Sequence, residues 1–167
     1  MTSSVVATST HGHAMNLLVR LLSASSAFQQ RLGVSSAEEA EKRIHWPWLQ
    51  EELVEESWPC AIIEEGEDVQ NAVAGGAVTQ FLPYGSLILT LSDKDRYVDQ
   101  FKDSWIDFRN FCDAVILDLI EKAGEDDNLD ISNTKCIQKA MHSPPTSSVV
   151  PYWSAKWEVS WGVEGGQ

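Results

Sequence analysis

The sequence predicts an α+β fold, in which a mainly antiparallel β-sheet packs against a long α-helix and an N-terminal helix. Three patterns predict this class. Apolar residues recur with helical spacing over residues 14–32 and again over residues 93–123, and apolar and polar residues alternate over residues 153–161. The first two patterns indicate amphipathic helices and the third a half-buried strand, so one chain carries both kinds of element.

The chain of 167 residues suffices for one domain with a hydrophobic core. We place this domain at residues 14–163, between a flexible N-terminal tail at residues 1–13 and a short C-terminal tail at residues 164–167. The N-terminal tail lacks the basic start and the apolar run of a secretion signal, and no window is apolar enough for a membrane span. We therefore expect no membrane partner.

The N-terminal helix is predicted by apolar residues at intervals of three and four, namely Ala14, Leu17, Leu21, Ala24, Phe28 and Leu32. Gly33 is expected to end this helix, because glycine readily takes the left-handed conformation that follows a last helical turn. Ser36 and Glu39 then have the spacing of a capping box, which predicts a second, short helix that runs to about Ile44.

Short strands are expected where apolar runs lie between turn signals. They are residues 58–64, 77–82, 86–91 and 131–141. The second and third are predicted to form a hairpin that turns at residues 83–85, and residues 71–76 a turn-rich bridge before it.

The long helix predicted at residues 93–123 carries two opposite stripes. The apolar stripe is expected to face the core and consists of Tyr97, Phe101, Trp105, Phe108, Cys112, Val115 and Leu119. The acidic stripe consists of Asp95, Asp99, Asp103 and Asp107. Because like charges four residues apart repel each other weakly, we expect this acidic face to point to solvent, with a channel or a partner as the alternative.

The last strand is predicted at residues 153–161, where Trp153, Ala155, Trp157, Val159 and Trp161 alternate with polar residues. Trp157 and Trp161 are expected in the core, packed against the long helix. A strand of this length at the edge of a sheet would pair readily with another chain, which favours assembly as its use.

The charge and the cysteines exclude several classes of protein. Twenty-five acidic and twelve basic residues give a formal net charge of −13, which repels a nucleic-acid backbone. Cys60, Cys112 and Cys136 are odd in number and far apart, which argues against a disulfide framework or a zinc site. We expect reduced thiols in the core.

We assign no catalytic, cofactor-binding or metal-binding residue, and we do not expect an enzyme. His11 and His13 offer two metal ligands without a third, and Gly75-Gly76 lacks the lysine and the glycine spacing of a phosphate-binding loop. Trp46, Trp48 and Trp58 lie near acidic residues and could form a cage for a cationic ligand. The simpler alternative is a loop held to the core by its indole rings. A small ligand-binding domain or enzyme remains the alternative from another functional class.

In order, the elements are an N-terminal helix that ends at Gly33, the Ser36–Ile44 segment, a strand after Pro59, a hairpin, a long helix and the terminal Trp157-Glu-Val-Ser-Trp-Gly162 strand. This order resembles the tail-terminator and tail-completion (neck) proteins of long-tailed bacteriophages and prophages. The resemblance covers most of the chain after residue 13. The chain departs from a typical small terminator in its acidic residues 51–68 and its acidic turn at 125–130.

The resemblance implies a structural virion protein without a cofactor, located in the tail or neck and assembled in the host cytoplasm. It implies a ring of identical subunits, usually a hexamer, that caps the tail tube and joins it to the head–tail connector proteins. DNA would pass through the ring without specific binding. Loops around residues 66–84 and 142–151 would meet neighbouring subunits, with Pro83, Tyr84, Pro151 and Tyr152 as interface residues. A head-completion protein or a minor tail subunit is the alternative position in the particle.

Overall fold

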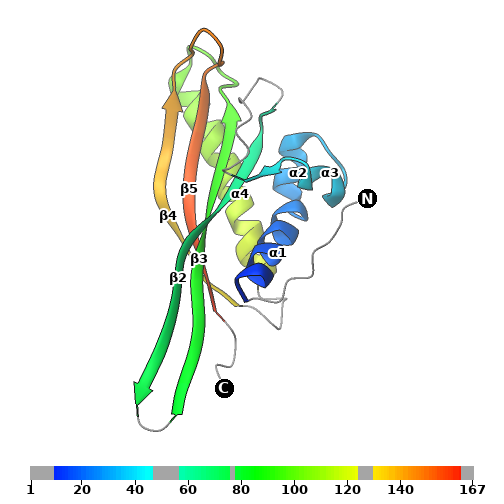
Figure 1. Ribbon diagram of the computed structural model, residues 1–167. Coiled ribbons are helices and arrows are strands. Elements are labelled where there is room, and N and C mark those ends of the chain that lie inside the picture. The colour runs from blue at the N-terminus through cyan, green and yellow to red at the C-terminus, as the bar shows by residue number, and fades with distance from the viewer. Residues whose placement is uncertain (1–9, 47–56, 76–77, 124–129, 163–167) are drawn as a thin grey trace.

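The computed structural model describes residues 10–46, 57–75, 78–123 and 130–162, and its fold is α+β, as predicted (Figure 1). The helices are α1 (Thr10–Ser23), α2 (Ser26–Leu32), α3 (Ala37–Glu41) and α4 (Phe101–Ala123). The strands are β1 (Ile44–His45), β2 (Cys60–Gly75), β3 (Val78–Lys94), β4 (Asp130–Ser143) and β5 (Tyr152–Gly162).

The strands form one sheet in the order β1-β2-β3-β5-β4, and only the short pair of β1 and β2 is parallel. The strands predicted at residues 131–141 and 153–161 are confirmed as β4 and β5. The expected position of the last strand is wrong, because β5 lies inside the sheet between β3 and β4. The edge strand on that side is β4.

The single helix predicted at residues 14–32 is broken into α1 and α2. Ser25 breaks it, because its backbone is extended and its side chain accepts a hydrogen bond from the backbone N–H of Phe28, which caps α2. Gly33 ends α2 with φ 72°, as predicted. Because α1 begins at Thr10, the last residues of the predicted flexible tail are helical.

Ser36 caps α3 by accepting a hydrogen bond from the backbone N–H of Glu39, which confirms the N-terminal cap predicted there. The helix ends at Glu41, earlier than predicted, because Ile44 and His45 pair with β2 as β1.

The predicted hairpin with a turn at residues 83–85 is wrong. β3 runs without interruption through these residues, and β2 continues through the predicted bridge to Gly75, so the two strands are joined at residues 76–77, outside the described residues. Pro83 fits inside β3 because in this stretch β3 pairs only with β2, so a proline without an N–H can occupy the free side of the strand.

β2 and β3 form an arm that extends beyond the five-stranded sheet (Figure 1). The pairing of β3 with β5 stops at Tyr84 and Gly162, whereas β2 and β3 continue through six more pairs, from Gln70–Pro83 to Gly75–Val78. At ~3.3 Å per residue, these pairs extend the ribbon by ~20 Å. We call residues 70–75 and 78–83 the arm.

A bulge lies at the root of the arm. Glu65 pairs with Leu87 and Asp68 with Gly85, so two residues of β2, the first of them Gly66, stand opposite the single residue Ser86. The backbones are so close here that a Cβ on Gly66 would lie 2.9 Å from the carbonyl oxygen of Ser86. Only glycine fits without a shift of the backbone.

Gly66→Ala is therefore expected to lower the free energy of unfolding by about 1–3 kcal/mol, because the added methyl group must displace the backbone of β3. Urea denaturation followed by tryptophan fluorescence measures this. Glu65→Ala, at the exposed neighbouring position, is the control and should change stability by less than about 0.5 kcal/mol. Equal stability of the two variants would contradict the close approach.

The long helix begins at Phe101 and not at residue 93. Asp93 and Lys94 end β3, where Asp93 pairs with Trp153 of β5, and Asp99 has a positive φ of 66°. Asp95 and Asp99 therefore lie before α4, and the predicted acidic face of four aspartates is wrong. Of the four, only Asp103 and Asp107 are on the helix.

The core lies between the helices and the face of the sheet that contains Leu89, Leu91, Trp157 and Val159. Trp157 is buried, as predicted, and the side chain of Trp161 lies outside the described part of the structure. Four of the helix residues predicted in the core are buried, namely Phe108, Cys112, Val115 and Leu119.

The core prediction is wrong for Phe101 and Trp105, which are 66% and 45% exposed, and for Tyr97, which precedes the helix and is also exposed. The buried face of α4 also includes Ser104 and Phe111, which places Trp105 outside it, and Phe101 is the first residue of the helix. Cys60 and Cys112 are buried, as predicted, but Cys136 is exposed, because it lies on the edge strand β4.

Candidate assembly surface

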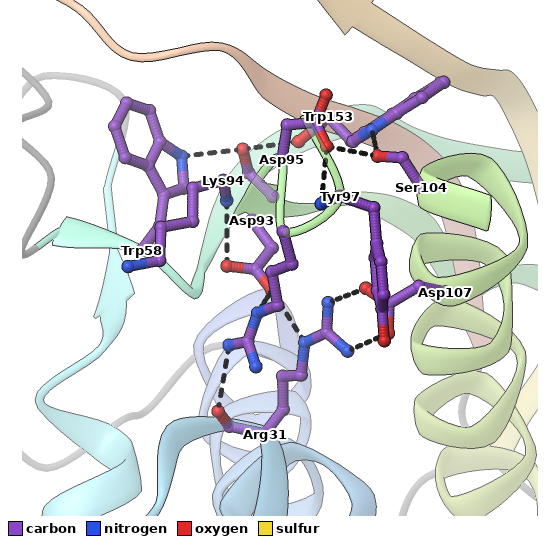
Figure 2. A network of polar contacts seen from close by, with 11 residues as sticks. Arg31, Trp58, Asp93, Lys94, Asp95, Tyr97, Ser104, Asp107 and Trp153 are labelled. Carbon is purple, nitrogen blue, oxygen red and sulfur yellow. Dashed lines mark hydrogen bonds and ion pairs between the residues drawn. The ribbon is translucent and has the colours of Figure 1, made fainter. Parts of the chain in front are cut away.

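One side of α4 is fixed to α2 by a network of charged side chains around Arg31 (Figure 2). The guanidinium of Arg31 donates to Asp107 through two nitrogens, at 2.9 and 2.6 Å, and to Asp93 at 2.6 Å. Arg96 also contacts Asp93, at 2.9 Å, and the Asp93 side chain is fully buried. Burial alone would lower the pKa of Arg31, but its bonds to Asp107 and Asp93 raise it, so Arg31 stays charged.

Asp107, predicted on a solvated acidic face, is thus part of an internal ion pair. Paired carboxylates and guanidinium groups with this bidentate geometry hold two elements in a fixed register. Asp103 remains exposed in the first turn of α4.

A second contact joins the same side of α4 to the N-terminus of α2. The carboxylate of Asp118 accepts hydrogen bonds from the Ser25 hydroxyl at 2.7 Å and from the backbone N–H of Ala27 at 3.1 Å. Burial would raise the pKa of Asp118, but these hydrogen bonds and the charge of Lys122 lower it. The ionised carboxylate also suits the positive end of a helix.

The lowered pKa of Asp118 predicts a dependence of stability on pH. Because the pKa is lower in the folded than in the unfolded chain, ionised Asp118 stabilises the protein above about pH 4, and this stabilisation is lost as the pH falls through the folded-state pKa. Asp118→Asn should lower the free energy of unfolding by at most about 1 kcal/mol at neutral pH and reduce its loss between about pH 5 and about pH 2.

Urea denaturation at a series of pH values measures this loss. Asp103→Asn, at an exposed position on the same helix, is the control and should keep the wild-type pH dependence. The role of Asp118 would be contradicted by a variant whose stability falls with acid as steeply as that of the wild type.

Asp95 occupies the turn before α4 and joins it to β4 and β5 (Figure 2). Its carboxylate accepts hydrogen bonds from the Ser104 hydroxyl and contacts Nε2 of His142 at 3.0 Å, and its backbone N–H donates to the carbonyl of Pro151 at 2.8 Å. Burial would raise the pKa of Asp95, but the hydrogen bonds from Ser104 and from the backbone of Tyr97 lower it. Asp95 is therefore not part of an acidic face for a partner.

The residues predicted at the interface lie in different environments. Pro151 is half-buried beside Asp95, and the ring of Tyr152 stacks on that of Trp58 at 4.9 Å between centroids. Both take part in contacts within the subunit. Pro83 and Tyr84 lie in β3 at the root of the arm, and their side chains lie outside the described part of the structure.

The aromatic cage is not formed by Trp58, because this side chain is buried and donates from its indole nitrogen to the Ser92 hydroxyl at 3.0 Å. Trp46 packs against the hydrophobic core, and Trp48 lies outside the described residues. For Trp58 and Trp46 the interpretation as anchors to the core is confirmed.

The other side of α4 is an exposed apolar surface. At about 100° per residue, its members on α4 fall within an arc of about 100°. They are Phe101, Trp105, Ile116 and Ile120, and all are exposed except Ile116, which is half-buried. This side faces β4, because the ring of Phe101 lies 6.1 Å from that of His142.

Cys136 of β4 extends this surface. It pairs in register with Trp157, which places it on the helix side of the sheet. Burial above all raises the pKa of the Cys112 thiol on α4, and Cys136 adds to this rise, so the two cysteines are neighbours. We call Phe101, Trp105, Ile116, Ile120 and Cys136 the α4–β4 face.

The arm is the second surface that could meet a partner. Its backbone pairs only within the β2–β3 ribbon in the described structure, so both of its long edges have backbone groups free for a further strand. The sequence carries no charged residue from Val69 to Ser92, in a chain with a net charge of −13. This uncharged stretch is the sequence signal that predicts a contact surface.

A hollow lies between α2 and α4. It has a volume of about 320 Å³ and is lined by Ala27, Gln30, Arg31, Arg96, Phe111 and Ala114. Its two arginines are both bound to Asp93. Within residues 10–46, 57–75, 78–123 and 130–162, no cluster of three His, Cys, Asp or Glu side chains could hold a metal ion.

A comparison of the chain with protein-family models finds no match, and a comparison with curated proteins finds none either. Across the helices that the structure describes, none has both the length and the apolar character that crossing a membrane requires.

Proposed function

We propose that the protein is a structural subunit that associates with copies of itself, and that it serves as the ring-forming tail terminator of a long-tailed phage or prophage particle. The arm is the observation that carries this proposal. A two-stranded ribbon that extends ~20 Å from its sheet is only marginally stable in water by itself. Contact with another chain would stabilise it by covering its uncharged surface and its free edges.

The more specific part of the proposal is supported by the resemblance of element order to tail-terminator and neck proteins. The net charge of −13 per subunit agrees with a ring through which DNA passes without being bound. In this role the protein acts by shape, without enzymatic activity or a cofactor, and its partners are the tail tube and the head–tail connector. Its location would be the neck of the virion.

Size-exclusion chromatography with light scattering tests the proposal. We expect a closed oligomer whose mass is a whole multiple of 18.6 kDa, with six subunits as the expected number, alone or on addition of tail tubes. Electron microscopy of particles with this chain located in the density would then test the position in the neck. A strict monomer in both conditions would contradict the proposed function.

A further inference from the structure

We infer that the arm of one subunit docks on the α4–β4 face of the next subunit, so that the contact runs head to tail around the ring. This inference rests on the proposed function and specifies its interface. The two surfaces are alike in chemistry: the arm lies in an uncharged stretch of sequence, and the exposed part of the face consists of Phe101, Trp105 and Ile120 together with Cys136. Burying both removes apolar surface from water.

The position of the two surfaces favours contact between copies over contact within one copy. The arm begins where the pairing of β4 and β5 ends, at Asp130 and Gly162, and it extends away from the sheet (Figure 1). It belongs to β2 and β3, whereas the α4–β4 face lies at the opposite edge of the sheet. A donor on one edge and an acceptor on the other make a heterologous contact, which closes into a ring when the rotation between subunits allows it.

The dimensions of the two surfaces also agree. Phe101 and Ile120 are nineteen residues apart on α4, which corresponds to ~28 Å along the helix axis, and the arm is ~20 Å long. Arg109 lies in the same arc and forms an ion pair at 3.1 Å with Asp113 at its border, so the pair brings no net charge to the face.

The opposite side of α4 is not open to a partner in the same way. There Asp107 and Asp118 are bound to Arg31 and to the N-terminus of α2. β4 itself is a poor template for a continuous added strand, because its register with β5 shifts at three places and its exposed Lys135 and Lys139 oppose pairing. The contact therefore depends mainly on the apolar side chains of α4.

The test uses two variants that remove one partner surface each. In the first, residues 70–83 are replaced by Asn-Gly, which joins Val69 to the opposite Tyr84 through a two-residue turn. In the second, Trp105→Glu places a charge on the face. The matched control is Leu117→Glu, because Leu117 is 55% exposed on α4 but lies outside the face.

We expect the wild type and Leu117→Glu to form the ring, and each of the two surface variants to have the mass of one subunit by light scattering. An equimolar mixture of the two variants should form a dimer and nothing larger, because it restores one arm–face contact. A wild-type ring that persists in Trp105→Glu, or a mixture that remains monomeric, overturns the inference and leaves the proposed function standing. A monomeric wild type overturns both.

A cross-linking experiment does not depend on the folding of these variants. Burial raises the pKa of the Cys60 thiol to about 12 and that of Cys112 further, so Cys136 is the reactive native thiol among the three. In Thr79→Cys, mild oxidation should link the arm of one subunit to Cys136 of the next and give a ladder of oligomers on a denaturing gel. Adding Cys136→Ser should abolish the ladder. A ladder that survives this substitution, or no ladder in Thr79→Cys, overturns the inference.

Discussion

Replacing Arg31 by methionine is expected to lower the free energy of unfolding by about 3 kcal/mol. Arg31 binds the fully buried Asp93 and the half-buried Asp107 together. Without Arg31, the partly exposed Arg96 is the one remaining ionic partner of Asp93 in the described structure. A buried carboxylate that is not fully paired lowers the free energy of unfolding. The loss also releases α2 from α4. Urea denaturation at neutral pH measures the change.

Arg109→Met is the matched control for this prediction. Arg109 pairs with Asp113 one turn further along α4, but the Asp113 side chain is 63% exposed and neither side chain is fully buried, so the expected loss is below about 1 kcal/mol. If the two variants lost the same stability, the ion pairs of Arg31 would not hold α2 and α4 together.

Trp153→Ala is expected to lower the free energy of unfolding by about 3–5 kcal/mol, because it removes one of the largest buried side chains. The indole of Trp153 stacks on the ring of Phe108 of α4, at 6.1 Å between ring centroids, and contacts the ring of His142 of β4 edge-on, at 4.8 Å. Its Nε1 donates to the Ser104 hydroxyl at 2.7 Å, which in turn donates to Asp95. One side chain thus joins the sheet to both the helix and the turn before it.

Two variants separate the contributions to this effect. Trp153→Phe keeps an aromatic ring and loses the N–H donor, so a loss of about 1–2 kcal/mol is expected. Trp105→Ala removes a tryptophan side chain at a position that is 45% exposed, and in the monomer it is expected to lower the free energy of unfolding by less than about 1 kcal/mol. Thermal or urea unfolding measures all three, and a small effect of Trp153→Ala would contradict its central place in the core.

Local rules of sequence were sufficient for part of the fold. Gly33 and Ser36 act through their own backbone and the next turn, so their roles as helix caps could be predicted from nearby residues alone. The alternation from Trp153 to Val159 likewise determines which face of β5 is buried. The place of β5 in the sheet could not be predicted, because pairing between distant strands leaves no local pattern.

The errors come from tertiary contacts that override local signals. Pro83 and Gly85 are typical of a turn, yet the strand pairing of β2 and β3 continues past them. The candidate surfaces were affected in the same way: periodicity alone placed Phe101 and Trp105 in the core, but the buried face of α4 includes Ser104 and Phe111, and the two aromatic side chains are exposed. The arm was detectable only as a stretch without charged residues.

The position of β5 has a consequence for synthesis on the ribosome. In the sheet, β3 pairs with β2 on one side and with β5 on the other. Because α4 and β4 lie between Lys94 and Tyr152 along the chain, β3 can pair on its second side only after β5 has been synthesised. At roughly 5–20 residues per second, the nascent polypeptide spends about 3–12 s with this strand, which carries no charge before Asp93, unprotected on one side. Aggregation competes with folding during the time between the synthesis of β3 and that of β5. A lower growth temperature, or co-expression of chaperones that bind unfolded chains, should therefore raise the yield of correctly folded protein.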